Sequence, residues 1–365
     1  MMIKPKKLER GDKVAIIALS SGSIGEPFME HQRNLIEKRL NEFGLEVVYT
    51  PNALKGIDFI KKNPQARAND LKWAFENDDI KGIICAIGGD DTYRTVPHLL
   101  EDEQFINNVK NKPKIFIGYS DATKNHLMFQ KIGLMTYYGH AAIVDFGEFA
   151  EEMLPYSKHW FEKLFETEPT IEIESSPIWY LERTAFDETV WGKERETRQE
   201  ENGYEVLNGT GMFRGKLIGG CLESLSDSLT GDRYSDELEI DSKYNLFPSI
   251  EELQGKVLFL ETSEEKPPSG KVKYYLTNLD NYGVFEAING VIIGKPQDET
   301  HYEGHKEVYK EIIGKHNKPI LFNMNFGHAH PKCILPYGAE VIVDCDNKKV
   351  TINESLVAEK QVTKK

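Results

Sequence analysis

Short, continuously apolar runs alternate with amphipathic stretches through the first 140 residues, and this alternation constrains the fold more than any other feature. Short apolar runs bounded by turn residues are typical of buried strands, and apolar residues three and four positions apart are typical of helices. The expected strands are 14–19, 45–49, 80–87, 114–117 and 134–138, and the expected helices include 66–77, 92–100 and 122–132. Strands that are apolar throughout are covered on both faces. The pattern therefore predicts an α/β fold with a parallel sheet between layers of helices.

The amino-acid composition of the sequence changes after about residue 150. Proline, tryptophan and charge become more frequent, and the stretch 193–203 (KERETRQEENG) is almost entirely polar. Strand-like and helical segments return from about residue 211. Because 365 residues exceed what one core usually organises, we predict an N-terminal domain over 1–165, a connecting segment and substrate loop over 166–210, and a smaller mixed α/β domain over 211–365.

The balance of charge excludes one class of function. The chain has 45 lysines and arginines against 59 aspartates and glutamates, a net charge of −14. No broad basic surface is therefore expected, and we predict no binding to polymeric nucleic acid. A local basic pocket for a single phosphate is compatible with this balance.

The sequence predicts a cytoplasmic protein that does not enter a membrane. No run approaches 18 apolar residues, and the first apolar run is too short for the core of a signal peptide. The cysteines form no Cys-x-x-Cys pair, and three of them lie in apolar, strand-like runs; they are Cys85, Cys221, Cys333 and Cys345. We expect reduced thiols rather than disulfides or a zinc site.

A candidate nucleophile lies in Gly118-Tyr119-Ser120-Asp121-Ala122, where an expected strand runs directly into an expected helix. This is nearly the G-x-S-x-G elbow, in which a sharp turn lifts the serine hydroxyl above the edge of the sheet. The alternative interpretation is a serine that caps the following helix.

A serine nucleophile needs a base and a group that orients it. His328 is the best base, because it follows a buried strand and a glycine and can project into a cleft. Glu261 is the best orienting group, because it ends the apolar strand KVLFL. Glu223 is a rival that we expect at the surface of a helix, and simple loop or solvent-facing roles remain alternatives for His328 and Glu261. The chain has ten histidines, at positions 31, 98, 126, 140, 159, 301, 305, 316, 328 and 330. We expect most of them at the surface.

Other motifs complete or compete with this site. Gly89, in Gly88-Gly89, can supply a backbone N–H for an oxyanion hole, and the N–H of Asp121 follows the nucleophile. His330 forms H-x-H with His328, but no carboxylate lies nearby in sequence, so we expect no metal. The loop 20–25 matches no phosphate-binding pattern, and we expect no nucleotide cofactor.

Together these motifs resemble the LD-carboxypeptidases and their close relatives, the microcin C self-immunity proteins. The resemblance covers nearly the whole chain and rests on six motifs in this order: IGGDDTYR (87–94), IGYSDAT (117–123), RGKLIGGCLESL (214–225), KVLFLE (256–261), GVIIGKP (290–296) and FGHAHP (326–331). It implies a flavodoxin-like N-terminal domain, a smaller β-rich C-terminal domain, and a triad of Ser120, Glu261 and His328 divided between them. It also implies a metal-independent homodimer without a cofactor.

The resemblance leaves the substrate open between two branches. LD-carboxypeptidases remove the terminal D-alanine of muropeptides, whereas the immunity branch cleaves the carboxamide between a peptidyl aspartate and a modified nucleotide. The segment before RGKLIGG resembles the immunity branch, and we expect Trp191 to stack on a planar group, with packing of the loop as the alternative. Asp91 and Cys221 are further candidate substrate contacts, although Cys221 stands where many immunity members have asparagine. An α/β-hydrolase esterase and a non-catalytic binding module are the remaining alternatives.

Overall fold

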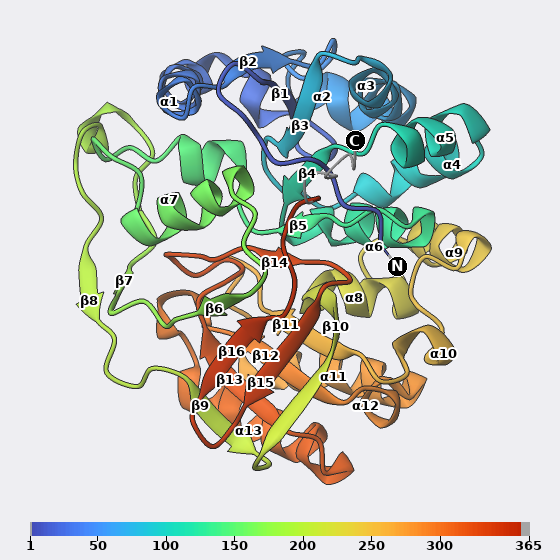
Figure 1. Cartoon of the computed structure of the whole chain (residues 1–365), viewed down its shortest axis with the longest axis vertical. Helices are drawn as coiled ribbons and strands as arrows, with labels where there is room; N and C mark the ends of the chain where they lie inside the picture. Colours follow the sequence, from blue (N-terminus) through green and yellow to red (C-terminus); the bar gives the residue numbers. More distant parts are fainter. Residues whose placement is uncertain (1, 359–365) are drawn as a thin grey trace, which may run out of the picture.

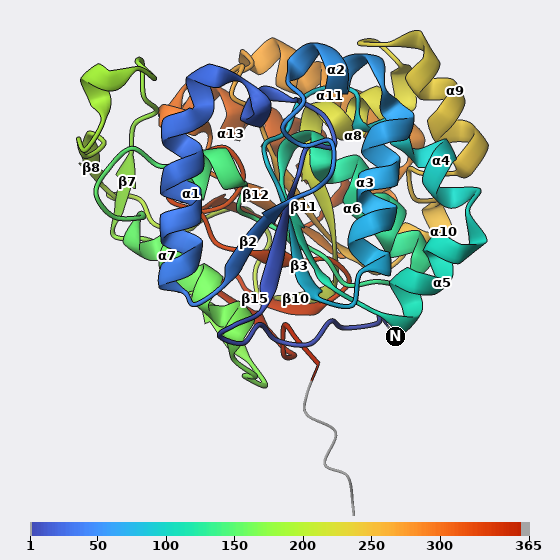
Figure 2. The ribbon, with the colours of Figure 1, turned by 90° about the horizontal axis from the view of Figure 1, so that it is seen from above.

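The computed structural model describes residues 2–358, and its N-terminal part is a parallel sheet between helices. The sheet has the order β14-β5-β4-β3-β1-β2, in which only β14 is antiparallel to its neighbour. Figure 2 shows α1 on one side of this sheet and α3 on the other. The strands are β1 (Lys13–Ile17), β2 (Glu46–Tyr49), β3 (Ile80–Cys85), β4 (Ile115–Gly118), β5 (Tyr137–Tyr138) and β14 (Leu335–Pro336). The helices beside them include α1 (Glu30–Glu42), α3 (Pro64–Glu76), α4 (Val96–Leu100), α5 (Glu103–Asn111) and α6 (Thr123–Ile132). The predicted fold class is confirmed.

The C-terminal part is a mixed sheet that lies below the first sheet in Figure 1. Its order is β6-β16-β15-β10-β11-β12-β13-β9, with a parallel centre from β10 to β13 and antiparallel strands on both sides. The strands are β6 (Ile171–Ile173), β9 (Glu205–Asn208), β10 (Met212–Cys221), β11 (Val257–Glu261), β12 (Gly290–Gly294), β13 (Ile320–Met324), β15 (Glu340–Asp344) and β16 (Lys349–Ile352). The helices of this part include α8 (Leu222–Thr230), α9 (Ser235–Tyr244), α10 (Ile250–Leu253), α11 (Ser269–Tyr282), α12 (Val284–Ala287) and α13 (Tyr302–Ile312).

The two sheets exchange strands with segments that lie far away in the sequence. The segment 166–210, which we expected to be a connection and a loop, supplies β6 and β9 to the two outer positions of the C-terminal sheet. The rest of it forms a separate ribbon of β7 (Ile178–Tyr180) and β8 (Thr197–Gln199). In return, β14 comes from the C-terminal part and pairs with β5 (Figure 1). Between residues 2 and 358, no helix is long and apolar enough to cross a membrane.

The end of β10 fixes the distance between the two sheets. Gly220 has a φ of +136°, and a Cβ at this position would lie 2.4 Å from Oγ1 of Thr123. The N–H of Cys221 donates to the same oxygen at 3.0 Å. Since Thr123 begins α6 and Cys221 pairs with Glu261 on β11, this contact determines where Glu261 lies relative to the end of β4.

We expect Gly220→Ala to destabilise the protein by about 1–3 kcal/mol, because the new methyl group overpacks the contact with Thr123 in a backbone conformation that alanine rarely adopts. Gly270→Ala is the matched control, since a Cβ there meets nothing within 4 Å; its stability should stay within about 1 kcal/mol of the wild type. Urea unfolding of both variants measures the difference. Equal midpoints for the two variants would contradict this account of the contact.

Candidate active site

Ser120 lies in a strained turn between β4 and α6. Its φ is +63°, in the left-handed region that residues other than glycine seldom adopt. A Cβ on Gly88 would lie 2.9 Å from the Ser120 hydroxyl oxygen, so only glycine leaves room for this turn. Ser120 is not the helix cap that we considered as an alternative, because Ala122 holds the N-cap position of α6. The local geometry is that of a nucleophile elbow.

Glu261 and His328 form a buried, charge-assisted pair. Glu261 is the last residue of β11, and His328 lies in the loop after β13. Nδ1 of His328 lies 2.7 Å from Oε2 of Glu261, and the backbone N–H of His328 donates to the same oxygen at 3.2 Å. These two contacts fix the plane of the imidazole ring and direct Nε2 away from Glu261.

Tyr138 joins this pair to Ser120, and the sequence analysis missed it. Its hydroxyl donates to Oε1 of Glu261 and accepts from the backbone N–H of Ser120 at 3.0 Å. Burial and the neighbouring Glu261 raise the pKa of the Tyr138 phenol far above its usual value, so it stays protonated and remains a donor. The sequence could have indicated Tyr138, because it ends β5, the strand beside β4, and neighbouring parallel strands end at the same edge of a sheet.

The second ring nitrogen of His328 is also occupied by a carboxylate. Nε2 lies 2.9 Å from Oε2 of Glu264, and between residues 2 and 358 no hydrogen bond links His328 to Ser120. Burial alone would lower the pKa of His328, but Glu261 and Glu264 together raise it to about 10. The hydrogen bond from His328 lowers the pKa of Glu264 to about 2. At neutral pH the structure therefore holds an imidazolium between two carboxylates.

Gly89 and Asp121 lie beside the elbow, as an oxyanion hole would require. No acceptor within residues 2–358 takes up the backbone N–H of either residue. The carboxylate of Asp121 has a separate, structural role, because it accepts from the Ser20 hydroxyl at 2.6 Å and from the Thr92 N–H at 2.9 Å. These bonds hold the Gly89 loop against the elbow.

Two cavities meet at Ser120. The larger has a volume of about 620 Å³ and exposes mostly apolar surface. It is lined by Ser120 and His328, and by aromatic side chains that include Phe28, Phe149 and Phe186. The smaller cavity, of about 20 Å³, lies between the elbow, α8 and the loop after β11, and Cys221 is among its lining residues. Ser120 and Glu264 line both cavities.

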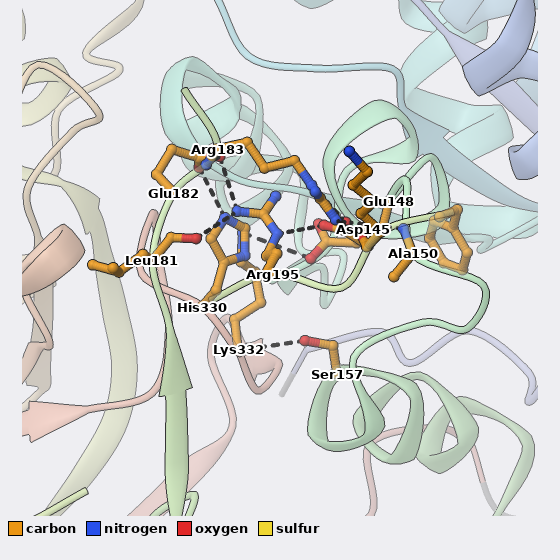
Figure 3. Close-up of polar contacts among 12 residues, drawn as sticks. Asp145, Glu148, Ala150, Ser157, Leu181, Glu182, Arg183, Arg195, His330 and Lys332 are labelled. Carbon is orange, nitrogen blue, oxygen red and sulfur yellow. Dashed lines mark hydrogen bonds and ion pairs between the residues drawn. The ribbon is translucent and has the colours of Figure 1, made fainter. Parts of the chain in front are cut away.

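A network of buried ion pairs fixes the outer wall of the larger cavity (Figure 3). Glu148 binds both Arg183 and Arg195, and Arg195 also binds Glu182 at 2.9 Å. Nε2 of His330 lies 3.0 Å from Glu182. His330 thus belongs to the wall and not to a shared site with His328, and no cluster of metal-ligand type occurs among the described residues.

Comparison with known proteins identifies the family. A family model for the N-terminal domain of LD-carboxypeptidases matches residues 14–139, and the model for their C-terminal domain matches residues 214–343. An MccF-like protein from Streptococcus pneumoniae, solved in complex with AMP, is 46% identical and superimposes with a TM-score of 0.89, covering 93% of this chain and 98% of that chain. The chain belongs to the LD-carboxypeptidase family of serine peptidases. The predicted resemblance is confirmed.

Two curated relatives represent the two branches of this family. The microcin C7 self-immunity protein MccF of Escherichia coli is 28% identical over 80% of this chain and 79% of that protein. A probable murein peptide carboxypeptidase of Bacillus subtilis is 26% identical over 96% of this chain and 94% of that protein. These values are close, so curated relatives alone do not choose between the branches.

The other candidate substrate contacts of this LD-carboxypeptidase family member differ in where they lie relative to the two cavities. Asp91 is buried in an ion pair with Arg67 at 2.6 Å and lines neither cavity. Trp191 is absent from the lining of the larger cavity and stacks on His31, with ring centroids 3.8 Å apart. Cys221 does line the smaller cavity, where its thiol lies 3.3 Å from Glu223.

Two expectations about exposure were wrong. Glu223 is buried rather than exposed, because its carboxylate accepts from the N–H and the hydroxyl of Ser263 and so anchors the loop that follows β11. Several histidines expected at the surface are also buried, including His126, His140 and His305. Burial lowers the pKa of His126 to about 3 and that of His140 to about 4, so both are neutral core residues.

We expect Tyr138→Phe to slow labelling of Ser120 by a fluorophosphonate about tenfold, because the variant loses a hydrogen bond to a charged carboxylate and releases the N–H of Ser120. Tyr137→Phe is the matched control, since the hydroxyl of Tyr137 donates to the carbonyl of Leu356, outside the site. Equal labelling rates in the two variants would remove Tyr138 from the site.

Proposed function

We propose that this protein is a serine hydrolase with a Ser120–His328–Glu261 triad, and that it cleaves the amide-type bond between an aminoacyl or peptidyl group and a nucleotide. The observation that carries the proposal is that a serine elbow and a carboxylate-oriented histidine open into one cavity with aromatic walls. The AMP complex of the relative from Streptococcus pneumoniae supports a nucleotide in this cavity. The muropeptide carboxypeptidase reaction is the second candidate, favoured by the relative from Bacillus subtilis.

The proposed reaction proceeds through an acyl-enzyme. The reaction requires a neutral His328 whose Nε2 has left Glu264 and has released its proton to water. The Ser120 oxygen then attacks the carbonyl carbon of the substrate, and its proton passes to Nε2 of His328. The backbone N–H groups of Gly89 and Asp121 stabilise the negative charge on the carbonyl oxygen. His328 then gives the proton to the leaving nitrogen as the carbon–nitrogen bond breaks. Water attacks the Ser120 ester by the same route, which releases the acid and restores the serine.

The buried Glu261 keeps Nδ1 protonated and stabilises the imidazolium that forms when His328 accepts the proton. Tyr138 and the N–H of His328 satisfy the remaining lone pairs of Glu261, so the carboxylate cannot turn away from the ring. These steps use only side chains and backbone N–H groups of the site and the water that attacks the ester.

Aromatic side chains at the mouth of the larger cavity suit a planar base. Phe28 and Phe186 are 65% and 62% exposed although both line the cavity, so a ligand can cover them. Exposed aromatic faces of this kind bind bases by stacking. The nearby arginines of the wall already pair with Glu148 and Glu182, which leaves stacking as the main contribution of this wall.

We expect Ser120→Ala to lose on the order of 10³-fold or more in turnover, since it removes the nucleophile while the fold is retained. Mass spectrometry of products from a peptidyl-nucleotide and a muropeptide tetrapeptide, offered in parallel, measures the loss and identifies the substrate branch. Near-normal turnover in this variant would reject the mechanism. Release of D-alanine alone would assign the second candidate function.

We expect Phe186→Ala to weaken the binding of AMP by about 1–3 kcal/mol, the usual contribution of one stacked base. Trp191→Ala should weaken it less, because Trp191 stacks on His31 and is absent from the lining of the larger cavity. Isothermal titration calorimetry of both variants makes the comparison. A larger loss in Trp191→Ala would return the stacking role to Trp191.

A further inference from the structure

Glu264 occupies the position beside His328 that the hydroxyl of Ser120 needs in the proposed reaction. Its carboxylate lies 2.9 Å from Nε2 of His328, the atom that has to accept the proton of Ser120. The side chain is 65% exposed, whereas that of Glu261, on the other ring nitrogen, is fully buried. One carboxylate is therefore fixed in the protein, and the other can turn into solvent or toward a ligand.

Glu264 also stands between the two cavities. It lines both the larger and the smaller cavity, as Ser120 does. A substrate of Ser120 has two parts, an acyl group and a leaving group, that must extend from the attacked carbon in different directions. Movement of Glu264 away from His328 would join the two cavities beside the nucleophile and free Nε2 in one step.

The charge of the smaller cavity indicates what would move Glu264. Within residues 2–358, Arg233 is the one basic side chain that lines this cavity, and it pairs with Asp227 and Glu265. The other ionisable residues of the lining are acidic; they are Asp90, Asp121, Glu223, Glu237 and Glu264. Burial raises the pKa of Asp121, Glu223 and Glu237, which makes a further negative charge in this cavity costly. An acidic group of a substrate would be repelled here, whereas an ammonium group would compensate the charge.

We propose that Glu264 is a specificity-determining residue: it holds His328 in the free enzyme, and an ammonium group of the substrate in the smaller cavity draws it away. Without Glu264, Nε2 of His328 releases its proton to water and becomes free to accept the proton of Ser120. This inference rests on the proposed function of the triad. Under this proposal the enzyme prefers substrates whose acyl group has a free α-amine or a cationic side chain. The aspartyl and glutamyl ligands seen in solved complexes of MccF carry an acidic side chain in addition to an α-amine.

The protonation of His328 gives a first test that needs no substrate. The ionisable groups around the ring are Glu261, Glu264 and Tyr119, and burial keeps the phenol of Tyr119 neutral. Glu264→Gln removes one of the two carboxylates, so the midpoint of His328 in a histidine NMR titration should fall by about one pH unit or more. His328→Asn assigns the signal. An unchanged midpoint would overturn the proposal.

The second test compares three sulfamoyl adenosines that carry an alanyl, an N-acetylalanyl or an Nα-acetyllysyl group. The alanyl and Nα-acetyllysyl compounds each have one ammonium group, and the N-acetylalanyl compound has none. The wild type should cleave at least one of the two ammonium-bearing compounds with a kcat/KM about tenfold or more above that for N-acetylalanyl. Whichever of the two is faster locates the ammonium group on the α-carbon or on the side chain. In Glu264→Gln this preference should fall to about twofold or less, because the ammonium group loses its partner. The acidic limb of kcat/KM for N-acetylalanyl should also move to lower pH, since His328 becomes neutral at a lower pH.

Glu307→Gln is the matched control, because Glu307 is an exposed carboxylate on α13 that pairs with Lys310 and lines neither cavity. It should retain the substrate preference and the pH profile of the wild type. A Glu264→Gln variant that also retains both would overturn the role of Glu264. Failure of the proposed function is distinguishable, because the wild type would then neither release sulfamoyl adenosine from any compound nor label at Ser120 with a fluorophosphonate.

Discussion

The buried carboxylate of Glu261 is the constraint on which the arrangement of the two sheets depends. A carboxylate inside a protein is costly unless its oxygens are paired and hydrogen-bonded. Glu261 obtains its partners from both sheets: Tyr138 reaches it from the N-terminal sheet, and His328 reaches it from the C-terminal sheet. Any shift of one sheet against the other would leave this charge unsatisfied. The requirement that stabilises the interface therefore also positions His328 relative to Ser120.

The sequence predicted the features that depend on local pattern. Ser120, Glu261 and His328 each follow a short apolar strand, and such strands are recognisable one at a time. The parallel order of the N-terminal strands followed from their alternation with helices. The two outer strands of the C-terminal sheet could not be predicted from such local patterns. The strands β6 and β9 are three and four residues long and lie in a polar, irregular segment, so they become strands only because longer partners are already in place.

Two residues whose environment the sequence did not reveal share a different property: their partners come from distant parts of the chain. Glu223 sits on a helix, in a pattern typical of the surface, yet Ser263 covers its carboxylate. Asp91 adjoins the glycine loop, where a substrate contact was reasonable, yet Arg67 of α3 lies beneath it. In both cases these partners are polar groups whose positions no periodicity of the sequence indicates. Burial of polar residues is thus the property that sequence patterns predict least well.

The two halves of the active-site cleft differ in rigidity, and charge explains the difference. The wall around residues 181–195 buries few apolar side chains, so it is attached through Glu148, Arg183 and Arg195, whose charges are almost fully buried and mutually satisfied (Figure 3). Removing one of these three residues would leave a buried charge without a partner, so this wall is held in a fixed position. Glu264 is held by one ion pair in which its own carboxylate is exposed, so this pair holds it less firmly than buried pairs hold the wall. The cleft therefore combines a rigid aromatic side, suited to recognising shape, with a side where a single carboxylate can respond to the charge of the substrate.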